Sequence, residues 1–243
     1  MTRASTLSLV RGGIIAAGEG SRLRADGYRV SKPMVQVGGR PLIDHALDRF
    51  RSAGIRHLTI VINEASDDCR QWLKGHARDF DLDMIIRSTP SSYATFRLVA
   101  DRLADAPAVI TTVDTIMPAD QFETFVTSAS RLPDDAVVLG VTDHVDDENP
   151  LWVTLETSNG RIRHIGGGGG THVTAGLYWL PAKRLDAPTK DFARLRDYLG
   201  SLVAEGQPVY GIVLPGVFDI DRARDVAAAE GAVFGLQREK SES

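Results

Sequence analysis

The sequence has little cysteine and no long apolar run. Its 243 residues include one cysteine, Cys69, which cannot form an intramolecular disulfide and which we interpret as a small filler beside a helix. This excludes a disulfide-stapled secreted fold and favours a reducing compartment. No segment approaches the roughly 20 apolar residues of a membrane span, and the first ten residues hold no stretch long enough for a signal peptide. We therefore expect a soluble, cytoplasmic protein with no membrane partner.

Neither sign of charge dominates the chain. The 28 Lys and Arg residues stand against 32 Asp and Glu residues, a formal net charge of -4. There is thus no bulk electrostatic reason to expect nucleic acid or an anionic membrane as a partner, and any phosphate binding must be local. At 43% hydrophobic content the chain is long enough to bury a sizeable core. No linker separates two units, so we expect a single domain over residues 1–243.

The first half, residues 1–135, alternates two periodicities. Unbroken apolar runs that end at polar or glycine residues are typical of buried strands. Between them, apolar residues share helical faces, as in the segment from Leu42 to Phe50, which Gly54 ends. Two more helices are expected around Trp72 and Phe96. The expected strands are Gly13–Ala17, Leu58–Ile62, Met84–Ile86 and Val109–Val113.

The second half, residues 136–243, has strand-like runs in close succession. "AVVLGV", "LWVTLE", "RIRHI" and "HVTAGLYWL" are separated by turns, which predicts hairpins in an antiparallel extension of the same sheet. A helix from about Phe192, a strand over Val209–Val213 and a last helix from about Arg222 to Phe234 follow, and the tail "QREKSES" is expected to fray. The fold class is therefore α/β: a Rossmann-like, mostly parallel sheet flanked by helices, with an antiparallel extension.

A glycine-containing loop follows the first expected strand, in "GGIIAAGEGSRLRADGYRVSKPMVQVGGRPLI". Such loops place backbone N–H groups where they meet an anion. The dinucleotide fingerprint fails, because Leu23 stands where the third glycine of G-x-G-x-x-G belongs. A phosphate-binding Walker A loop fails as well, because no G-K-[ST] follows. A tight turn without a ligand would explain the glycines, but not Arg22 and Lys32.

The order A-A-G-x-G-x-R, then K-P, then "GGRPLI" resembles the signature of the nucleotidyltransferases that make NDP-sugars and related activated alcohols. The resemblance implies a Rossmann-like sheet whose first loop wraps a nucleoside triphosphate, and transfer of its nucleotidyl group to a phosphorylated acceptor with release of pyrophosphate. The implied nucleotide-binding residues of this loop are Ala16, Ala17, Gly18, Glu19, Gly20 and Ser21.

Two cations are the expected catalytic residues. A triphosphate carries about four negative charges, so attack by a second phosphate has a largely electrostatic barrier. Arg22 can bind two phosphate oxygens with its planar guanidinium. Lys32 can bring a point charge to the α-phosphate as negative charge develops.

Three carboxylates are the expected Mg²⁺ ligands. Asp114 directly follows a buried strand and matches the family's metal aspartate, although a lone aspartate there usually caps a turn. Asp219 and Asp221, in "GVFDIDRARDV", resemble the family's closing D-x-D segment and alternate with Ile220, so both point to one side of an extended stretch. We expect Asp114 and Asp221 to bind Mg²⁺ with support from Asp219; a helix N-cap is the alternative role for Asp221.

The segments that would read the base and the acceptor are less distinctive. Ser88, Thr89 and Ser91, in "RSTPSSYATF", are candidates for contacting the base, with a capped helix start as the alternative. Trp152, Thr174 and Gly176 are the candidates on the acceptor side. Family members carry a Glu-Lys pair there, which this chain lacks; five consecutive glycines, Gly166 to Gly170, are either a lid, an anion site or a flexible loop. Arg163, His164 or His172 is a candidate for replacing the lysine's charge.

These features favour a Mg²⁺-dependent nucleotidyltransferase that joins a nucleoside triphosphate to a phosphorylated small molecule, with a sugar 1-phosphate preferred. Two alternatives stay open at this point. One is a cytidylyltransferase for a phosphorylated amino-alcohol or polyol, or a molybdopterin-type transferase, whose ligand Trp152 would stack against. The other is a nucleotide-binding module without transfer chemistry. Retention of both cations and both aspartates ranks catalysis first.

Overall fold

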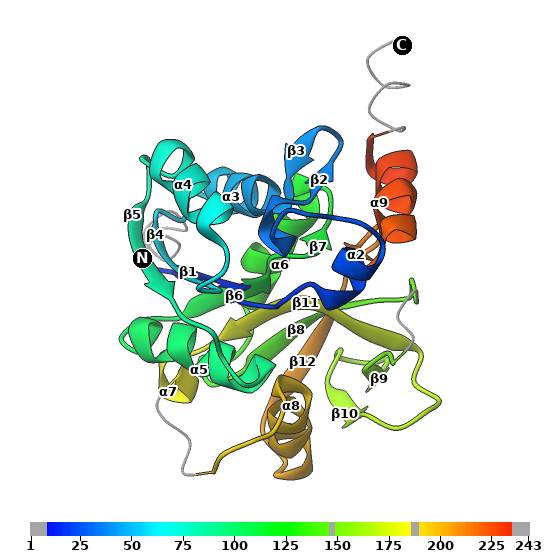
Figure 1. The fold of residues 1–243 in the computed structure, drawn as a ribbon. Helices are drawn as coiled ribbons and strands as arrows, with labels where there is room; N and C mark the ends of the chain where they lie inside the picture. Colours follow the sequence, from blue (N-terminus) through cyan, green and yellow to red (C-terminus); the bar gives the residue numbers. More distant parts are fainter. Residues whose placement is uncertain (1–8, 146–148, 186–189, 235–243) are drawn as a thin grey trace, which may run out of the picture.

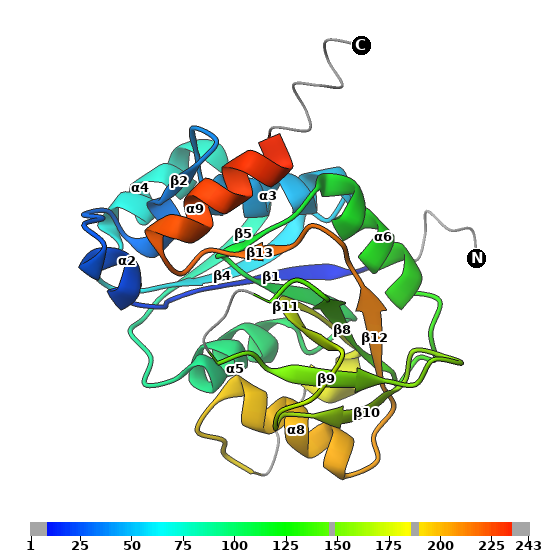
Figure 2. The ribbon, with the colours of Figure 1, turned by 90° about the vertical axis from the view of Figure 1, so that its right-hand side faces the viewer.

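The computed structural model describes residues 9–145, 149–185 and 190–234. A nine-stranded sheet forms the centre, in the order β10-β9-β11-β6-β1-β4-β5, with β8 joined to β11 and β12 joined to β8. Helices cover both of its faces (Figures 1 and 2). The α/β class with a mostly parallel sheet is thus confirmed.

The first half builds the parallel part of the sheet by strand–helix–strand crossovers. The order β6-β1-β4-β5 is parallel throughout. Each expected strand is present, extended by one to three residues at its start and ending within a residue of the expected position. These strands are β1 (Arg11–Ala16), β4 (His57–Ile62), β5 (Asp81–Ile86) and β6 (Ala108–Thr112). The helices are α3 (Leu42–Ser52), α4 (Asp67–His76), α5 (Ser92–Leu103) and α6 (Ala119–Ala129).

The second half extends the sheet with strands of both senses. β11 (His172–Leu180) lies antiparallel between β6 and β8 (Val137–Thr142), and β9 (Trp152–Leu155) forms a hairpin with β10 (Ile162–Ile165). β12 (Val209–Val213), a strand whose direction the sequence left open, pairs with β8 in parallel. The helix α8 (Leu195–Ala204) lies between β11 and β12 in the chain, and β12 runs opposite to β11, since β11 is antiparallel and β12 parallel to β8.

Two apolar cores lie on opposite faces of the sheet (Figure 2). One is built under α3, α4 and α6, where the rings of Phe50 and Phe122 meet edge to face at 5.1 Å. The other lies under α5 and α8, where Phe96 and Tyr198 pack at 5.5 Å. Each aromatic side chain buried in this way contributes about 1.5–3 kcal/mol, so both faces of the sheet are held by packed helices.

Short elements complete the described chain. The helix expected from Phe192 begins at Leu195, and the last helix consists of α9 (Ala223–Ala229) and a single π-helical turn, η2 (Glu230–Phe234). The tail "QREKSES" lies outside the described residues. Within the described ranges, no helix combines the length and apolar character that crossing a membrane needs. The remaining short elements are α2 (Ser21–Ala25), η1 (Lys32–Met34), α7 (Ala182–Leu185), and the short strands β2 (Gln36–Val37), β3 (Arg40–Pro41), β7 (Thr115–Ile116) and β13 (Phe218–Asp219).

Candidate functional site

A two-stranded sheet brings distant carboxylates together at the carboxyl edge of the main sheet. β7 follows β6 directly and pairs antiparallel with β13, so that Thr115 lies opposite Asp219. The N–H of Ile220 donates to the carbonyl of Asp114 at 3.0 Å. These contacts place the chain around Asp221 beside Asp114, although more than a hundred residues separate the two in sequence.

The ammonium of Lys32 lies between these two carboxylates. Its Nζ donates to Asp114 Oδ2 and to Asp221 Oδ1, each at 2.5 Å, and the side chain is only 9% exposed. Burial by itself would lower the pKa of Lys32, but the charges of Asp114, Asp219 and Asp221 raise it well above its usual value. Lys32 therefore carries a permanent positive charge at the strand ends.

Arg22 joins the same cluster from the first loop. Its Nη1 donates to Asp221 Oδ2 at 2.8 Å. Gly20, which precedes α2, has φ +63°, and a Cβ at this position would lie 2.9 Å from the Cβ of Lys32. A glycine is therefore needed for the loop and the lysine to approach each other. Both predicted catalytic cations and two of the three predicted metal ligands, Asp114 and Asp221, thus form one ion cluster.

Asp114 is the most buried carboxylate of the cluster. Burial would raise the pKa of Asp114, but the Lys32 charge and hydrogen bond hold it below its usual value. Its Oδ1 is buried and has no hydrogen-bond partner. An unpaired buried oxygen costs free energy, so this atom has capacity for a further ligand.

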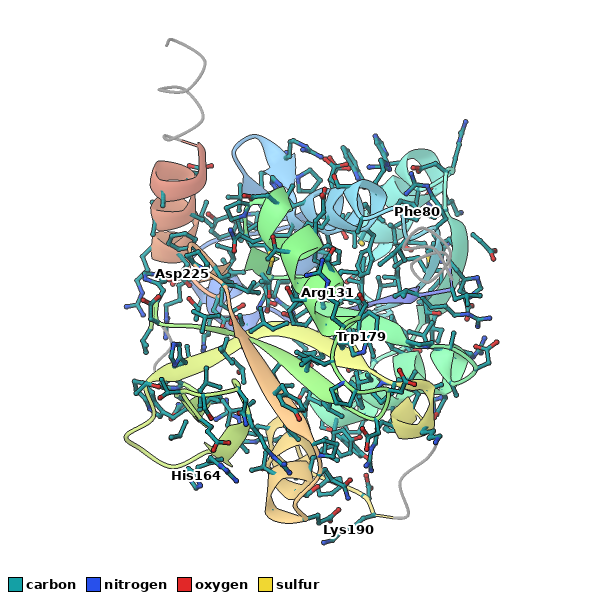
Figure 3. All side chains as sticks on the ribbon, turned by 180° about the vertical axis from the view of Figure 1, so that it is seen from behind. Phe80, Arg131, His164, Trp179, Lys190 and Asp225 are labelled. Atoms are coloured by element: carbon teal, nitrogen blue, oxygen red, sulfur yellow. The ribbon has the colours of Figure 1, made fainter. Side chains whose placement is uncertain are left out.

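Capping of the last helix falls to Asp225 instead of Asp221. Asp225 Oδ2 accepts hydrogen bonds from the N–H groups of Asp221, at 2.9 Å, and Arg222, at 2.7 Å. Figure 3 shows Asp225 at the base of α9. The capping alternative for Asp221 is therefore wrong, since its carboxylate faces Lys32 and Arg22.

The carboxylates fit a Mg²⁺ ion that is completed by substrate. In the part of the chain that the structure describes, no three acidic, histidine or cysteine side chains are gathered closely enough to hold a metal alone. Mg²⁺ commonly takes one or two protein carboxylates together with substrate phosphates and water. The unpaired Oδ1 of Asp114 and the adjacent Asp221 match that requirement.

The first loop separates into a buried and an exposed part. Ala16 and Ala17 are buried, and Asn63 Nδ2 donates to the carbonyl of Ala17 at 3.0 Å. Gly18, Glu19 and Ser21 are exposed. A cavity of about 190 Å³ lies beside them, lined by Gly18, Glu19, Arg24, Arg29, Lys32 and Asn63 among others.

The three residues proposed to read the base lie where β5 runs into α5. Ser91 is the N-cap of α5, because its Oγ accepts from the N–H of Ala94 at 3.1 Å. Thr89 Oγ1 lies 2.6 Å from Thr95 Oγ1. Ser88 is exposed, and its Oγ donates to Asn63 Oδ1 at 3.4 Å. Asn63 thus bridges the first loop and Ser88, a role that sequence analysis missed because a lone asparagine after a strand carries no distinctive signal.

A second cavity of about 190 Å³, which we call the acceptor cavity, adjoins the ion cluster. Thr174 and Gly176 line it, as do Asp114, Asp219 and Asp221, whereas Trp152 does not. Gly176 has φ +62°, and a Cβ there would lie 2.3 Å from Thr115 Oγ1. Its glycine therefore permits close packing of β11 against β7.

The cations that line the acceptor cavity differ from those suggested by the sequence. Arg163, His164 and His172 do not line it; Arg163 pairs with Glu156 at 2.8 Å, and Figure 3 shows His164 on β10, away from Asp225. Arg196, on α8, lines it instead, together with Arg22, Arg222 and Arg224. Tyr178, also missed, lines it as a phenol whose pKa is raised by burial and by the charges of Asp219 and Asp114.

Comparisons with known proteins identify the family of the chain. The model of the MobA-like NTP transferase domain matches residues 12–215. Mannose-1-phosphate guanylyltransferase 1 of Arabidopsis thaliana is 24% identical over 94% of this chain and 66% of its own length. CMP-5'-(3-aminopropyl)phosphonate synthase of Streptomyces rubellomurinus is 29% identical over 37% of this chain and 14% of its own. The chain thus spans less than two thirds of these relatives.

The fold recurs in the inositol-1-phosphate CTP transferase from T. maritima, with a TM-score of 0.73 and 18% identity over 93% of this chain and 97% of that one. The family model covers most of the sheet and the loop, Lys32 and Asp114 within it. This chain belongs to the family of MobA-like NTP transferase domains.

Proposed function

We propose that this protein transfers a nucleotidyl group from a nucleoside triphosphate to a sugar 1-phosphate, giving an NDP-sugar and pyrophosphate. The observation that carries the proposal is the ion cluster, in which Lys32 is held between Asp114 and Asp221 while Arg22 reaches it from the glycine loop. We take residues 1–243 as one domain, whose first half, 1–135, holds the nucleotide and whose second half, 136–243, holds the acceptor.

The side-chain cations of the ion cluster, Arg22 and Lys32, lower the electrostatic barrier of the reaction. An acceptor phosphate oxygen forms a bond to the α-phosphorus, while the bond from that phosphorus to the bridging oxygen breaks and pyrophosphate leaves. Arg22 and Lys32 stabilise the charge that develops on the transferred group and the leaving group. The exposed backbone of Gly18–Ser21 binds the β- and γ-phosphates with N–H groups that need no side-chain ordering.

Asp114 and Asp221 would hold Mg²⁺, with Asp219 in support. A bound Mg²⁺ would neutralise phosphate charge and orient the triphosphate. Without it, Lys32 balances the two carboxylates; once the triphosphate is bound, the same ammonium is placed to interact with phosphate oxygens instead. Thr174 and Gly176 would line the acceptor's place in the acceptor cavity, and Ser88, Thr89 and Ser91 remain candidates for contacting the base. The single cysteine favours a cytoplasmic enzyme.

The second candidate function is transfer of a cytidylyl group from CTP to an acceptor other than a sugar 1-phosphate. The local similarity to CMP-5'-(3-aminopropyl)phosphonate synthase favours it, since the compound in that relative's name is a CMP-linked phosphonate and not an NDP-sugar. Thermal shifts with each of CTP, UTP, dTTP, GTP and ATP at saturating Mg²⁺ separate the candidates, because only a nucleotide that binds the folded state raises the melting temperature.

The test of transfer is pyrophosphate release from each nucleoside triphosphate with a panel of sugar 1-phosphates. Lys32→Ala and Asp114→Ala should lose release, whereas Lys74→Ala, on the exposed side of α4, should retain it. Folded Lys32 or Asp114 variants with full activity contradict the proposal. Tight nucleotide binding without release for any acceptor supports a non-catalytic binding module instead.

A further inference from the structure

A larger cavity adjoins the acceptor cavity on the side of α8. It measures about 480 Å³, and we call it the distal cavity. Pro150, Leu151 and Arg196 line both cavities. The two are therefore neighbours with a shared wall, and a ligand with its phosphate at the ion cluster can extend past Arg196 into the distal cavity.

The sizes of the cavities bear on the size of the acceptor. Small-molecule pockets usually measure about 300–1,000 Å³. The acceptor cavity, at about 190 Å³, falls below that range on its own. Together with the distal cavity it falls within the range, so the space beside the ion cluster suits a molecule longer than one phosphorylated ring.

The walls of the distal cavity are apolar on one side and polar on the other. Trp152 and Ile165, from β9 and β10, provide an indole and an aliphatic surface. Arg196 and Asp197, from α8, provide one charge of each sign. An indole packs against the face of a ring, and a guanidinium donor beside a carboxylate acceptor suits hydroxyl groups, which both donate and accept. These walls match an uncharged, hydroxylated ring.

The α8 wall contains a glycine that packing does not require. Gly200 lies in the middle of α8, one turn after Arg196, and lines the distal cavity. A Cβ at this position would meet its nearest neighbour, Ile165 Cγ2, at 3.7 Å, which is ordinary van der Waals contact. Glycine in a helix interior costs about 1 kcal/mol relative to alanine. The absence of a side chain keeps this wall of the cavity open.

We propose that the distal cavity binds a second, uncharged sugar ring, so that the acceptor is a sugar 1-phosphate extended by a further ring. The proposal rests on the proposed function, because it takes the phosphate of the acceptor to lie at the ion cluster. Trp152, which does not line the acceptor cavity, then contacts the second ring rather than the phosphorylated one.

A thiol placed at Gly200 tests this occupancy. The native Cys69 is buried, and burial raises its pKa to about 12, so it will not react with N-ethylmaleimide at neutral pH. In Gly200→Cys the new thiol is in the distal cavity, and its maleimide adduct fills the space. Ala204→Cys, exposed at the end of the same helix and lining neither cavity, is the matched control.

Pyrophosphate release is measured with glucose 1-phosphate, mannose 1-phosphate and galactose 1-phosphate, and with maltose, cellobiose and lactose 1-phosphates, before and after labelling. We expect the unlabelled protein to prefer at least one disaccharide 1-phosphate over the one-ring compound that forms its phosphorylated end. Labelled Gly200→Cys should lose that preference, with KM for the disaccharide raised at least about tenfold, or about 1.4 kcal/mol. KM for the nucleoside triphosphate should stay unchanged, as should all constants of labelled Ala204→Cys.

The other outcomes are distinct from one another. If one-ring acceptors are used as well as or better than every disaccharide, or if labelling at position 200 leaves the disaccharide KM unchanged, the distal-cavity proposal is overturned while the proposed function stands. An equal loss for one-ring and two-ring acceptors also overturns it, because the distal cavity would then hold the first ring. If none of the tested acceptors leads the unlabelled protein to release pyrophosphate, the proposed function itself fails.

Discussion

Replacing Lys32 by methionine removes the positive centre of the ion cluster and keeps most of the apolar stem. In the native protein the Lys32 ammonium lies 2.5 Å from Asp114 Oδ2 and 2.5 Å from Asp221 Oδ1. These two oxygens therefore lie within about 5 Å of each other. Without the ammonium, Asp114 loses its ion-pair partner and faces Asp221, which keeps only its hydrogen bond from Arg22 Nη1 at 2.8 Å, and we expect the variant to fold with reduced stability.

The size of the effect follows from Coulomb's law. Two like charges about 5 Å apart repel by about 3 kcal/mol at an effective dielectric constant of about 20. Removing one partner of a buried ion pair typically costs about 3–5 kcal/mol. Because Asp221 is 33% exposed, solvent screening places the expected loss at the lower end, near 3 kcal/mol. For a chain of this length, that loss lowers Tm by about 6–12 °C.

The assay combines thermal unfolding with a Mg²⁺ titration. In Lys32→Met the freed carboxylates should bind Mg²⁺ more tightly than in the native protein, where Lys32 occupies them both. Saturating Mg²⁺, at about 100 times its Kd, restores about 2.7 kcal/mol. Pyrophosphate release should remain absent even in the stabilised variant, because the charge that acts on the transferred phosphate is missing. Lys74→Met, on the surface of α4, serves as the control for handling and for nonspecific effects of Mg²⁺.

Two results would refute this reasoning. A Lys32→Met variant as stable as the native protein without Mg²⁺ would show that the carboxylates do not repel one another at this site. A loss of stability that Mg²⁺ leaves unchanged in the variant would show that Asp114 and Asp221 do not form a cation site.

Three further predictions concern the same edge of the sheet. The pKa of Asp114 is lowered from 3.8 and that of Lys32 raised from 10.5, so the native protein keeps their stabilisation between these values and loses it as the pH falls below about 4. In Lys32→Met no ammonium holds the pKa of the buried Asp114 down, so this carboxyl takes up its proton at a higher pH than in the native protein, which relieves the variant. The difference in unfolding free energy between native protein and Lys32→Met, from urea titrations, should therefore be largest near neutral pH and shrink as the pH falls, beginning above about pH 4. Gly176→Ala should lose about 2 kcal/mol or more of unfolding free energy in the same titration, because alanine is strained at φ +62° and its Cβ meets two threonine hydroxyls. Gly168→Ala, with open space around it, should leave the unfolding free energy unchanged, and equal losses in the two variants would contradict the packing argument. Asp225→Ala should lower the unfolding free energy by about 1 kcal/mol through the lost cap, and it should reduce pyrophosphate release by freeing the backbone of Asp221. Asp225→Asn should recover part of both losses. An unchanged melting temperature in Asp225→Ala would exclude the capping role.

The sequence predicted the fold through local patterns. Buried strands read as unbroken apolar runs, and the run at Val209–Val213 matches β12 in both bounds. The sense of that strand was not predictable, because it depends on β8 being its partner, and the composition of neither strand specifies that pairing. The observed boundaries of α8 and α9 differ from the expected ones by one to several residues. Caps and tertiary contacts, which the apolar pattern does not show, decide where a helix begins and ends.

The candidate site divides in a similar way. Arg22, Lys32, Asp114 and Asp221 were candidates because their segments resemble motifs of the nucleotidyltransferase family, and the structure brings all four together. Sequence patterns did not reveal Asn63, Tyr178, Arg196 or Gly200, because each is an ordinary residue within its own element. They matter through neighbours that lie far away along the chain.

By itself, the sequence determined the α/β class, the phosphate-type loop and the charged residues available for chemistry, because these follow from periodicity and from local backbone requirements. Only the tertiary structure decided which charges meet. The β7–β13 pairing sets Asp221 beside Asp114, Asp225 takes over the cap, and Lys32 closes the cluster. The physical reason is that ion pairing and cavity shape depend on distances between segments, and chain closure over a hundred residues leaves no trace in either segment's own sequence.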